Sequence, residues 1–222
     1  MKQAIPNALT MLRIVLCLVM FGAFYILFEG LYGRVIFPFL TSARPLAWTI
    51  LVCFYVAALT DFLDGYLARK WNVVSTLGAV LDPIADKILV CGAIVGLIAI
   101  QGPLRQLDDS LGGWILIPGT LILFREFAVS AMREVLAPKG IKLPVTFLAK
   151  TKTTLQLLSI AALIAFIFWP SWGLPNIAWL QQGINGAKWL FAFSSLITVW
   201  TGIEYAMAAA KALKGQDART TA

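Results

Sequence analysis

The sequence predicts an all-α, polytopic membrane protein with six transmembrane helices, as its composition and hydropathy pattern indicate. Hydrophobic residues make up 60% of the 222-residue chain and charged residues only 13%, whereas soluble domains contain about 25% charged residues. Six apolar stretches each reach roughly the 20 residues that a helix needs to cross the hydrocarbon core. No repeat or change of composition divides them, so we expect one integral membrane domain over residues 1–222. The predicted spans are residues 8–28, 46–68, 77–100, 114–136, 145–169 and 187–213.

The basic residues predict the orientation of the chain in the membrane. If the N-terminus is cytoplasmic, eleven lysines and arginines fall at cytoplasmic ends and loops and four fall outside, in line with the enrichment of positive charge in cytoplasmic loops. We therefore expect both termini on the cytoplasmic side of the inner (cytoplasmic) membrane. The net charge of +7 indicates contact with anionic membrane lipids. Outside the predicted spans the chain has no basic run interleaved with aromatic residues, the pattern that would indicate binding of nucleic acid.

The chain has no histidine, and its three cysteines, Cys17, Cys53 and Cys91, fall inside apolar stretches. Small buried packing residues are the simplest interpretation of such cysteines. No cysteine or histidine spacing indicates a zinc site. A catalytic base would therefore be a carboxylate, a lysine, a tyrosine or a cysteine.

Four aspartates lie close together in the sequence, toward the facing ends of the second and third predicted spans. Each carboxylate costs at least a few kcal/mol in a bilayer, so a positive partner must stabilise the group. Asp61 and Asp64 are three residues apart and Asp82 and Asp86 are four apart, so each pair shares one face of its helix. Because the connection is short, we expect the two helices to pack against each other and to bring the four carboxylates together at the cytoplasmic end.

Several carboxylates in one place indicate a site for hard divalent ions. Oxygen ligands suit Mg²⁺, Mn²⁺ or Ca²⁺ rather than soft metals, and four carboxylates are enough for two ions about 4 Å apart. Gly65, Ala68 and Gly78 would leave space for a ligand, although small residues in membrane helices usually serve helix packing. Arg69 would reach a phosphate held by the metals, or would extend with Lys70 to the membrane surface. A cation transporter is an alternative from a different class, but its acidic residues would be spread over several helices.

The spacing of these residues also matches a family signature. The pattern D-x2-D-G-x2-A-R-x8-G-x3-D-x3-D, from residue 61 to residue 86, resembles without departure the signature of the CDP-alcohol phosphatidyltransferases. The resemblance implies six membrane helices, usually assembled as a homodimer. It further implies transfer of a phosphatidyl or similar group from a CDP-linked donor to an alcohol, with release of CMP. The intact signature argues against a catalytically inactive structural member.

The resemblance implies two divalent ions, Mg²⁺ or Mn²⁺, as cofactors. It gives Asp86 a second role as the general base that takes the proton from the acceptor hydroxyl. The expected metal ligands are Asp61, Asp64, Asp82 and Asp86.

A donor pocket is implied in the same way. The element Pro6-Asn7-x2-Thr10-x2-Arg13 would lie beside the nucleotide. Helix capping by Asn7 and Thr10 is the alternative interpretation, but it does not explain Arg13, one turn further into an apolar stretch. The residues expected to bind the CDP donor are Asn7, Thr10, Asp64, Gly65, Ala68, Arg69 and Gly78.

Basic residues in the fourth and fifth predicted spans indicate the acceptor. Arg125 and Arg133 fall near one helix face, and Lys150 and Lys152 begin the next helix at the same level. Such a pocket would suit an acceptor that itself carries a phosphate. Alternatively, Arg133, Lys150 and Lys152 set the orientation of the chain in the membrane and attract anionic lipid headgroups. Arg125 lies deep in an apolar stretch, where this alternative does not apply.

Three motifs resemble one branch of the family, the bacterial phosphatidylglycerophosphate synthases: PNxLTxxR, REx6RE and KxKTTxQ. One departure is Ala149, where relatives often have glycine. The resemblance implies that CDP-diacylglycerol and sn-glycerol 3-phosphate react to give phosphatidylglycerophosphate and CMP. Family members that use inositol phosphate, serine or phosphatidylglycerol as acceptor are the alternatives.

Overall fold

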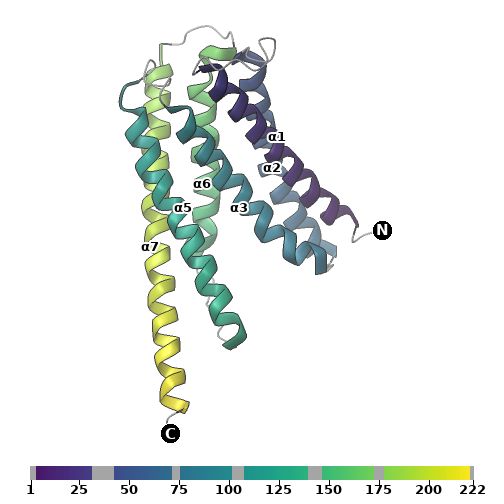
Figure 1. Cartoon of the computed structure of the whole chain (residues 1–222), viewed down its shortest axis with the longest axis vertical. Helices are drawn as coiled ribbons and strands as arrows, with labels where there is room; N and C mark the ends of the chain where they lie inside the picture. Colours follow the sequence, from purple (N-terminus) through teal and green to yellow (C-terminus); the bar gives the residue numbers. More distant parts are fainter. Residues whose placement is uncertain are drawn as a thin grey trace.

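The computed structural model describes residues 4–31, 43–71, 76–101, 108–139, 147–172 and 178–220. The described part is helical and contains no strand, which confirms the all-α fold class (Figure 1). Two short 3-10 helices, η2 (Ala137–Lys139) and η3 (Pro170–Trp172), follow longer ones. The long helices are α1 (Ala4–Leu31), α2 (Ala43–Trp71), α3 (Thr76–Ala99), α5 (Leu111–Leu136), α6 (Phe147–Ile167) and α7 (Leu180–Thr220).

Four helical segments of the described chain are long and apolar enough to cross a membrane: Asn7–Leu31, Arg44–Leu67, Leu111–Leu136 and Leu180–Leu213. The protein is thus a membrane protein, while the full count of six spans stays a prediction. Helix α7 has 41 residues, and a helix of that length measures about 60 Å, roughly twice the hydrocarbon thickness. Its C-terminal end extends beyond the other helices (Figure 1).

Helix α1 lies at the centre of the first group of helices. It packs extensively against both α2 and α3, whereas the described residues of α2 and α3 touch each other only sparsely. The expectation that α2 and α3 pack directly on each other is therefore wrong. The reason is a close fit of α1 on α3: a methyl group added at Gly92 or Gly96 would overlap with the rings of Phe21 and Phe24 from α1.

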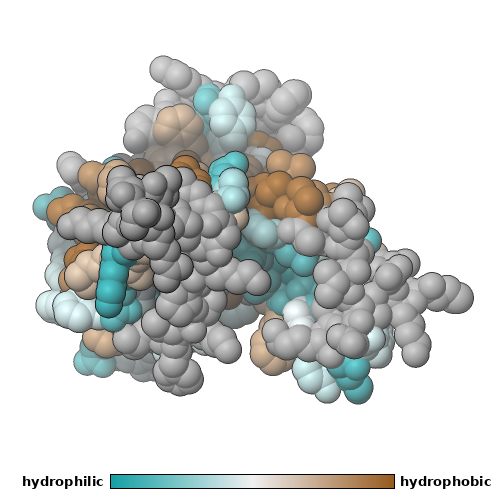
Figure 2. Space-filling model, turned by 90° about the horizontal axis from the view of Figure 1, so that it is seen from below, coloured by the Kyte–Doolittle hydropathy of each residue, from teal (hydrophilic) through white to brown (hydrophobic). Residues whose placement is uncertain are grey.

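A second group of helices is formed by α7, which packs along both α5 and α6. Helix α3 joins the two groups through α5, where Gly119 lies so close to Ile94 that an added Cβ would be 2.7 Å from its Cγ2 atom. The two groups meet at the top of Figure 1 and diverge toward the bottom. Seen from below, hydrophilic side chains gather in the hollow between them (Figure 2). This fold leaves room for polar chemistry at the end of the bundle where the two groups diverge (Figure 2).

A polar cluster joins the beginnings of α5 and α7 at the opposite end. Lys188 is buried, and its Nζ atom donates to Asp108 Oδ2 at 2.5 Å and to Ser110 Oγ at 2.9 Å. Gln181 Nε2 donates to the same Asp108 oxygen at 3.1 Å. Partial burial alone would raise the pKa of Asp108, but the hydrogen bonds from Lys188 and Ser110 outweigh it and lower this pKa to about 2.

We expect Asp108→Asn to destabilise the protein at neutral pH, because buried Lys188 loses its counter-charge. We expect the free energy of unfolding to fall by roughly 2–3 kcal/mol. This is at or below the low end of the cost of removing one partner of a buried ion pair. The folded-state pKa of Asp108 lies below the value of about 3.9 for free aspartate. The stabilisation is therefore complete above that value and is lost as the pH falls through the folded pKa.

Thermal unfolding in detergent between pH 7 and pH 2 measures this effect. The advantage of the wild type over Asp108→Asn should shrink below pH 4. Asp109→Asn is the matched control, because the neighbouring Asp109 is exposed. Equal losses of Tm in the two variants would show that the Asp108–Lys188 pair does not stabilise the fold.

Candidate active site

The four aspartates converge, and Arg13 of α1 lies among them. Arg13 is fully buried, at 0% exposure. Its Nη1 atom lies 2.7 Å from Asp61 Oδ1 and 2.7 Å from Asp86 Oδ1, and its Nη2 atom pairs with Asp64. One guanidinium from α1 thus links carboxylates of α2 and α3.

The fourth aspartate is held by the same helix, one turn earlier. Thr10 Oγ1 donates to Asp82 Oδ1 at 2.7 Å. The predicted convergence is therefore present, but α1 mediates it rather than direct packing of α2 on α3. Asn7, half-buried, lies on α1 one turn before Thr10.

The aspartates differ in exposure. Asp64 is buried and Asp61 half-buried, whereas 53% of the Asp86 side chain is exposed. Asp86 is thus the most accessible of the three carboxylates around Arg13, and it can be reached from outside the protein. Its Oδ1 atom and that of Asp61 both lie within hydrogen-bond distance of one Arg13 nitrogen atom.

The other expected donor residues lie on the same helices. Gly78 is buried on α3 and Gly65 is half-buried on α2. Ala68 and Arg69 belong to α2, but their side chains fall outside the described part of the structure. Their expected contacts with a donor stay predictions.

The donor set of this cluster fits a hard divalent cation, because four carboxylates offer only oxygen ligands. Among the described residues, no group of three or more acidic or cysteine side chains is already arranged around a single metal position. The cation among the carboxylates is Arg13. Its Nε atom is buried and has no hydrogen-bond partner among the described residues. The described residues therefore do not satisfy all the hydrogen-bond donors of the Arg13 guanidinium.

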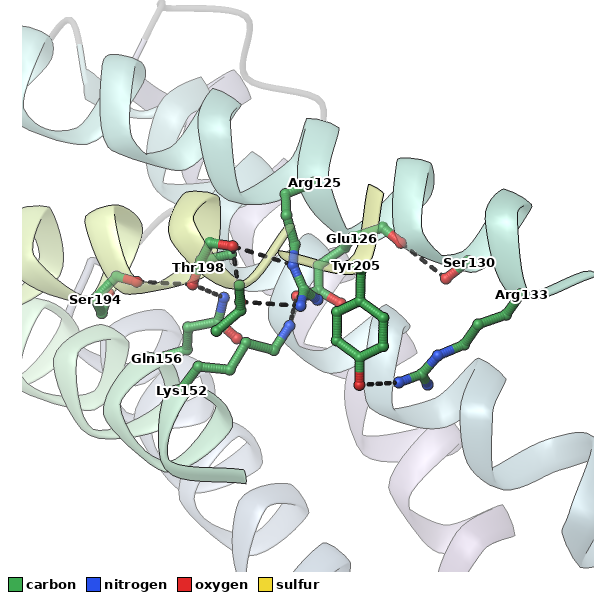
Figure 3. Close-up of polar contacts among 10 residues, drawn as sticks. Arg125, Glu126, Ser130, Arg133, Lys152, Gln156, Ser194, Thr198 and Tyr205 are labelled. Atoms are coloured by element: carbon green, nitrogen blue, oxygen red, sulfur yellow. Dashed lines mark hydrogen bonds and ion pairs between the residues drawn. The ribbon is translucent and has the colours of Figure 1, made fainter. Parts of the chain in front are cut away.

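A second polar cluster joins α5, α6 and α7 (Figure 3). Glu126 Oε1 accepts from Lys152 Nζ of α6 and, at 3.3 Å, from Arg125 Nη1 beside it on α5. Arg125 also donates through Nε to the Thr198 carbonyl oxygen at 3.1 Å and through Nη2 to Thr201 Oγ1 at 3.0 Å. Arg125 and Lys152 are both buried. The structure therefore brings together two of the predicted acceptor-binding cations.

Tyr205 of α7 extends this cluster toward Arg133. Its hydroxyl accepts from Arg133 Nη2 at 2.9 Å. The guanidinium carbons of Arg125 and Arg133 lie 5.6 Å and 5.0 Å from the centre of its ring, within the range of cation–π attraction. Lys150 lies in the first turn of α6, but its side chain is outside the described part. Three of the four expected cations thus belong to one contact network.

Sequence reasoning missed the contribution of α7. Its residues 194, 198, 201 and 205 are Ser, Thr, Thr and Tyr, and this spacing places them along one helix face. Thr198 also accepts from Gln156 Nε2 of α6 at 2.8 Å. A line of polar side chains in an apolar helix, facing other helices, was the signal that would have identified them.

An apolar groove of about 300 Å³ lies between α1, α3 and α5. Lys87, next to Asp86 in the chain, and Phe127, next to Glu126, both line it. The rest of its lining is apolar or small and comes from α1, α3 and α5: Phe21, Ile88, Cys91, Gly92, Val95 and Leu123.

The family model of the CDP-alcohol phosphatidyltransferases matches residues 3–200 of the chain. The protein belongs to this family. Three similar proteins are each named CDP-diacylglycerol–glycerol-3-phosphate 3-phosphatidyltransferase. The one from Cereibacter sphaeroides is 43% identical over 164 residues, which are 73% of this chain and 64% of that relative. The match therefore covers less than two thirds of that relative's length.

The other two relatives match over nearly their whole length. The protein from Haemophilus influenzae is 33% identical over 207 residues, 92% of each chain. The protein from Rickettsia bellii is 38% identical over 210 residues, 94% of this chain and 97% of the relative. The family match thus covers the whole aspartate cluster and the part of the basic cluster that precedes residue 201.

Proposed function

We propose that this protein transfers a phosphatidyl group from CDP-diacylglycerol to sn-glycerol 3-phosphate, giving phosphatidylglycerophosphate and CMP. The observation that carries the proposal is the similarity to transferases of that name over nearly the whole chain. The aspartate cluster and the basic cluster support it, because the reaction needs a place for a diphosphate and a place for a phosphorylated acceptor.

The aspartates would serve the donor. Asp61, Asp64, Asp82 and Asp86 would hold two divalent ions, Mg²⁺ or Mn²⁺. When bound, such ions neutralise phosphate charge and stabilise a leaving group such as CMP. The exposed side chain of Asp86 would take the proton from the acceptor hydroxyl. A carboxylate is a weak base for an alcohol, so its contribution would come from its position.

The remaining donor contacts would come from the surroundings of this cluster. The cytidine and the diphosphate would lie against α1, α2 and α3. The apolar groove next to Lys87 would accept part of an acyl chain, since its lining is chemically similar to lipid. The residues proposed for the donor headgroup are Asn7, Thr10, Asp64, Gly65, Ala68, Arg69 and Gly78.

The acceptor would bind at the basic cluster. Arg125 and Lys152 are buried and share Glu126 as counter-ion, which fixes both cations in place before an anion arrives. Arg133 and Lys150 would add charge at the entrance. A phosphate monoester can accept several charge-assisted hydrogen bonds from such a group.

We further propose six spans in the inner membrane, with both termini and the site on the cytoplasmic side, in one domain that forms a homodimer. The distribution of lysine and arginine supports the orientation. A water-soluble acceptor would then reach the site from the cytosol, and the lipid donor would enter from the bilayer.

Acceptor-dependent release of CMP from CDP-diacylglycerol tests the function. The purified protein should release CMP with sn-glycerol 3-phosphate in the presence of Mg²⁺ or Mn²⁺ and should stop when EDTA is added. Serine, inositol phosphate and phosphatidylglycerol serve as competing acceptors. Release of CMP with serine but not with glycerol 3-phosphate would overturn the proposal.

A further inference from the structure

Arg13 has a place that the donor-binding role does not explain. It is the fully buried group to which Asp61, Asp64 and Asp86 all point their oxygen atoms. These are three of the four residues proposed to bind metal. A guanidinium and a divalent ion would therefore compete for the same carboxylates.

The charges around Arg13 are far from balanced. One guanidinium faces three carboxylates directly, and the fourth, Asp82, accepts from the neutral Thr10 hydroxyl. Among the described side chains of this cluster, carboxylates outnumber cations, and such an excess of negative charge attracts further cations. Arg13 therefore offsets part of the repulsion among the aspartates and leaves negative charge that would favour a divalent ion.

The hydrogen bonding of Arg13 is also incomplete. Its Nε–H is buried and has no partner among the described residues, and an unsatisfied buried donor is costly. The side chain thus remains among the carboxylates because of charge attraction, while part of its hydrogen-bonding capacity is unused.

We propose that Arg13 is an internal counter-ion that competes with divalent cations for Asp61, Asp64 and Asp86. It holds the carboxylates together while no ion is bound, and it withdraws from them when ions bind. The inference rests on the proposed function in so far as that function includes divalent ions. It goes further by giving α1 control over how tightly the ions are held.

Binding of Mn²⁺ to the purified protein, followed by electron paramagnetic resonance of the free ion, tests the competition. Thermal unfolding with EDTA or with Mn²⁺ is the second measurement. Neither contains donor or acceptor, so both are independent of the transferase assay. Arg13→Gln removes the charge, and Arg13→Lys keeps it but loses the fork that reaches several carboxylates.

We expect Arg13→Gln to bind Mn²⁺ at least about tenfold more tightly than the wild type, because a positive charge next to the ligands is gone. In EDTA its Tm should fall by several degrees, and Mn²⁺ should restore most of the loss. Arg13→Lys should lie between wild type and Arg13→Gln in both measurements. Arg125→Gln is the control: it also removes a buried arginine paired with a carboxylate, but it should leave Mn²⁺ affinity unchanged.

Other results would overturn the inference. If Arg13→Gln binds Mn²⁺ no more tightly than the wild type, or its loss of Tm is not restored by Mn²⁺, Arg13 is a structural link between helices. Failure of Arg13→Gln to fold even when purified with Mn²⁺, while Arg13→Lys folds with wild-type affinity, has the same meaning. Absence of Mn²⁺ binding in every variant also overturns it, whatever the transferase assay shows.

Discussion

Asp86→Asn is expected to lower kcat for CMP release by about 10²–10⁴-fold, the usual contribution of a general base. Asparagine has the same shape as aspartate and can still accept from Arg13 Nη1, which lies 2.7 Å from Asp86 Oδ1. The cluster should therefore stay assembled around Arg13. What is lost is the ability of an exposed carboxylate to take a proton.

The experiment separates catalysis from binding. CMP release gives kcat, and equilibrium binding of CDP-diacylglycerol in the presence of Mn²⁺ gives donor affinity. Donor affinity should change much less than kcat, because three of the four carboxylates remain. Asp109→Asn, at an exposed carboxylate distant in the chain, is the control for general effects of charge. Loss of donor binding with normal residual chemistry would remove Asp86 from the role of base.

The helix faces that carry the four aspartates could be predicted from the sequence. The helix that contacts all four of them, α1, could not. Spacing within α2 and α3 depends only on the period of a helix, so it follows from the sequence directly. Which helix packs between them depends on shape, and here it is decided by the fit of Phe21 on Gly92 and of Phe24 on Gly96. Pairs of this kind are distant in sequence, and no local pattern connects them.

Of the three helices that form the basic cluster, the contributions of α5 and α6 could be predicted from the sequence. Arg125 in an apolar stretch is costly enough to indicate a partner or a ligand, and Lys152 begins the next helix. On α7, Thr198 and Thr201 also donate to their own helix backbone, at Ser194 O and Thr198 O. Each threonine can satisfy itself in this way, so a single one does not indicate an external partner; only the spacing of Ser194, Thr198, Thr201 and Tyr205 along one face does.

Loss of the basic cluster should affect the acceptor and not the donor. Arg125→Ala or Lys152→Ala is expected to raise KM for sn-glycerol 3-phosphate by about 10–100-fold, the equivalent of one hydrogen bond to a charged group. KM for CDP-diacylglycerol should change little. Steady-state CMP release with either substrate varied gives both values.

A substitution on α7 tests the position of Arg125 without removing its charge. A Cβ atom at Gly202 would lie 2.8 Å from Arg125 Cγ, so in Gly202→Ala the Arg125 side chain or the facing helix must shift. We expect this shift to weaken the hydrogen bonds of Arg125 to Thr198 and Thr201. We expect KM for the acceptor to rise by roughly three- to tenfold, less than in Arg125→Ala because the charge remains nearby. Gly186→Ala is the matched control on the same helix, since a Cβ there meets nothing within 4 Å.

The three variants and their control together decide whether the basic cluster is the acceptor site. If Arg125→Ala and Lys152→Ala raise KM for both substrates equally, the cluster stabilises the bundle and does not select the acceptor. If they act on the acceptor alone and Gly202→Ala does not, the charge of Arg125 matters but its anchoring on α7 does not. The acceptor-site proposal expects KM for the acceptor alone to rise most in Arg125→Ala and Lys152→Ala, less in Gly202→Ala and not at all in Gly186→Ala. Only that order agrees with an acceptor phosphate bound by Arg125 in the position where α7 holds it.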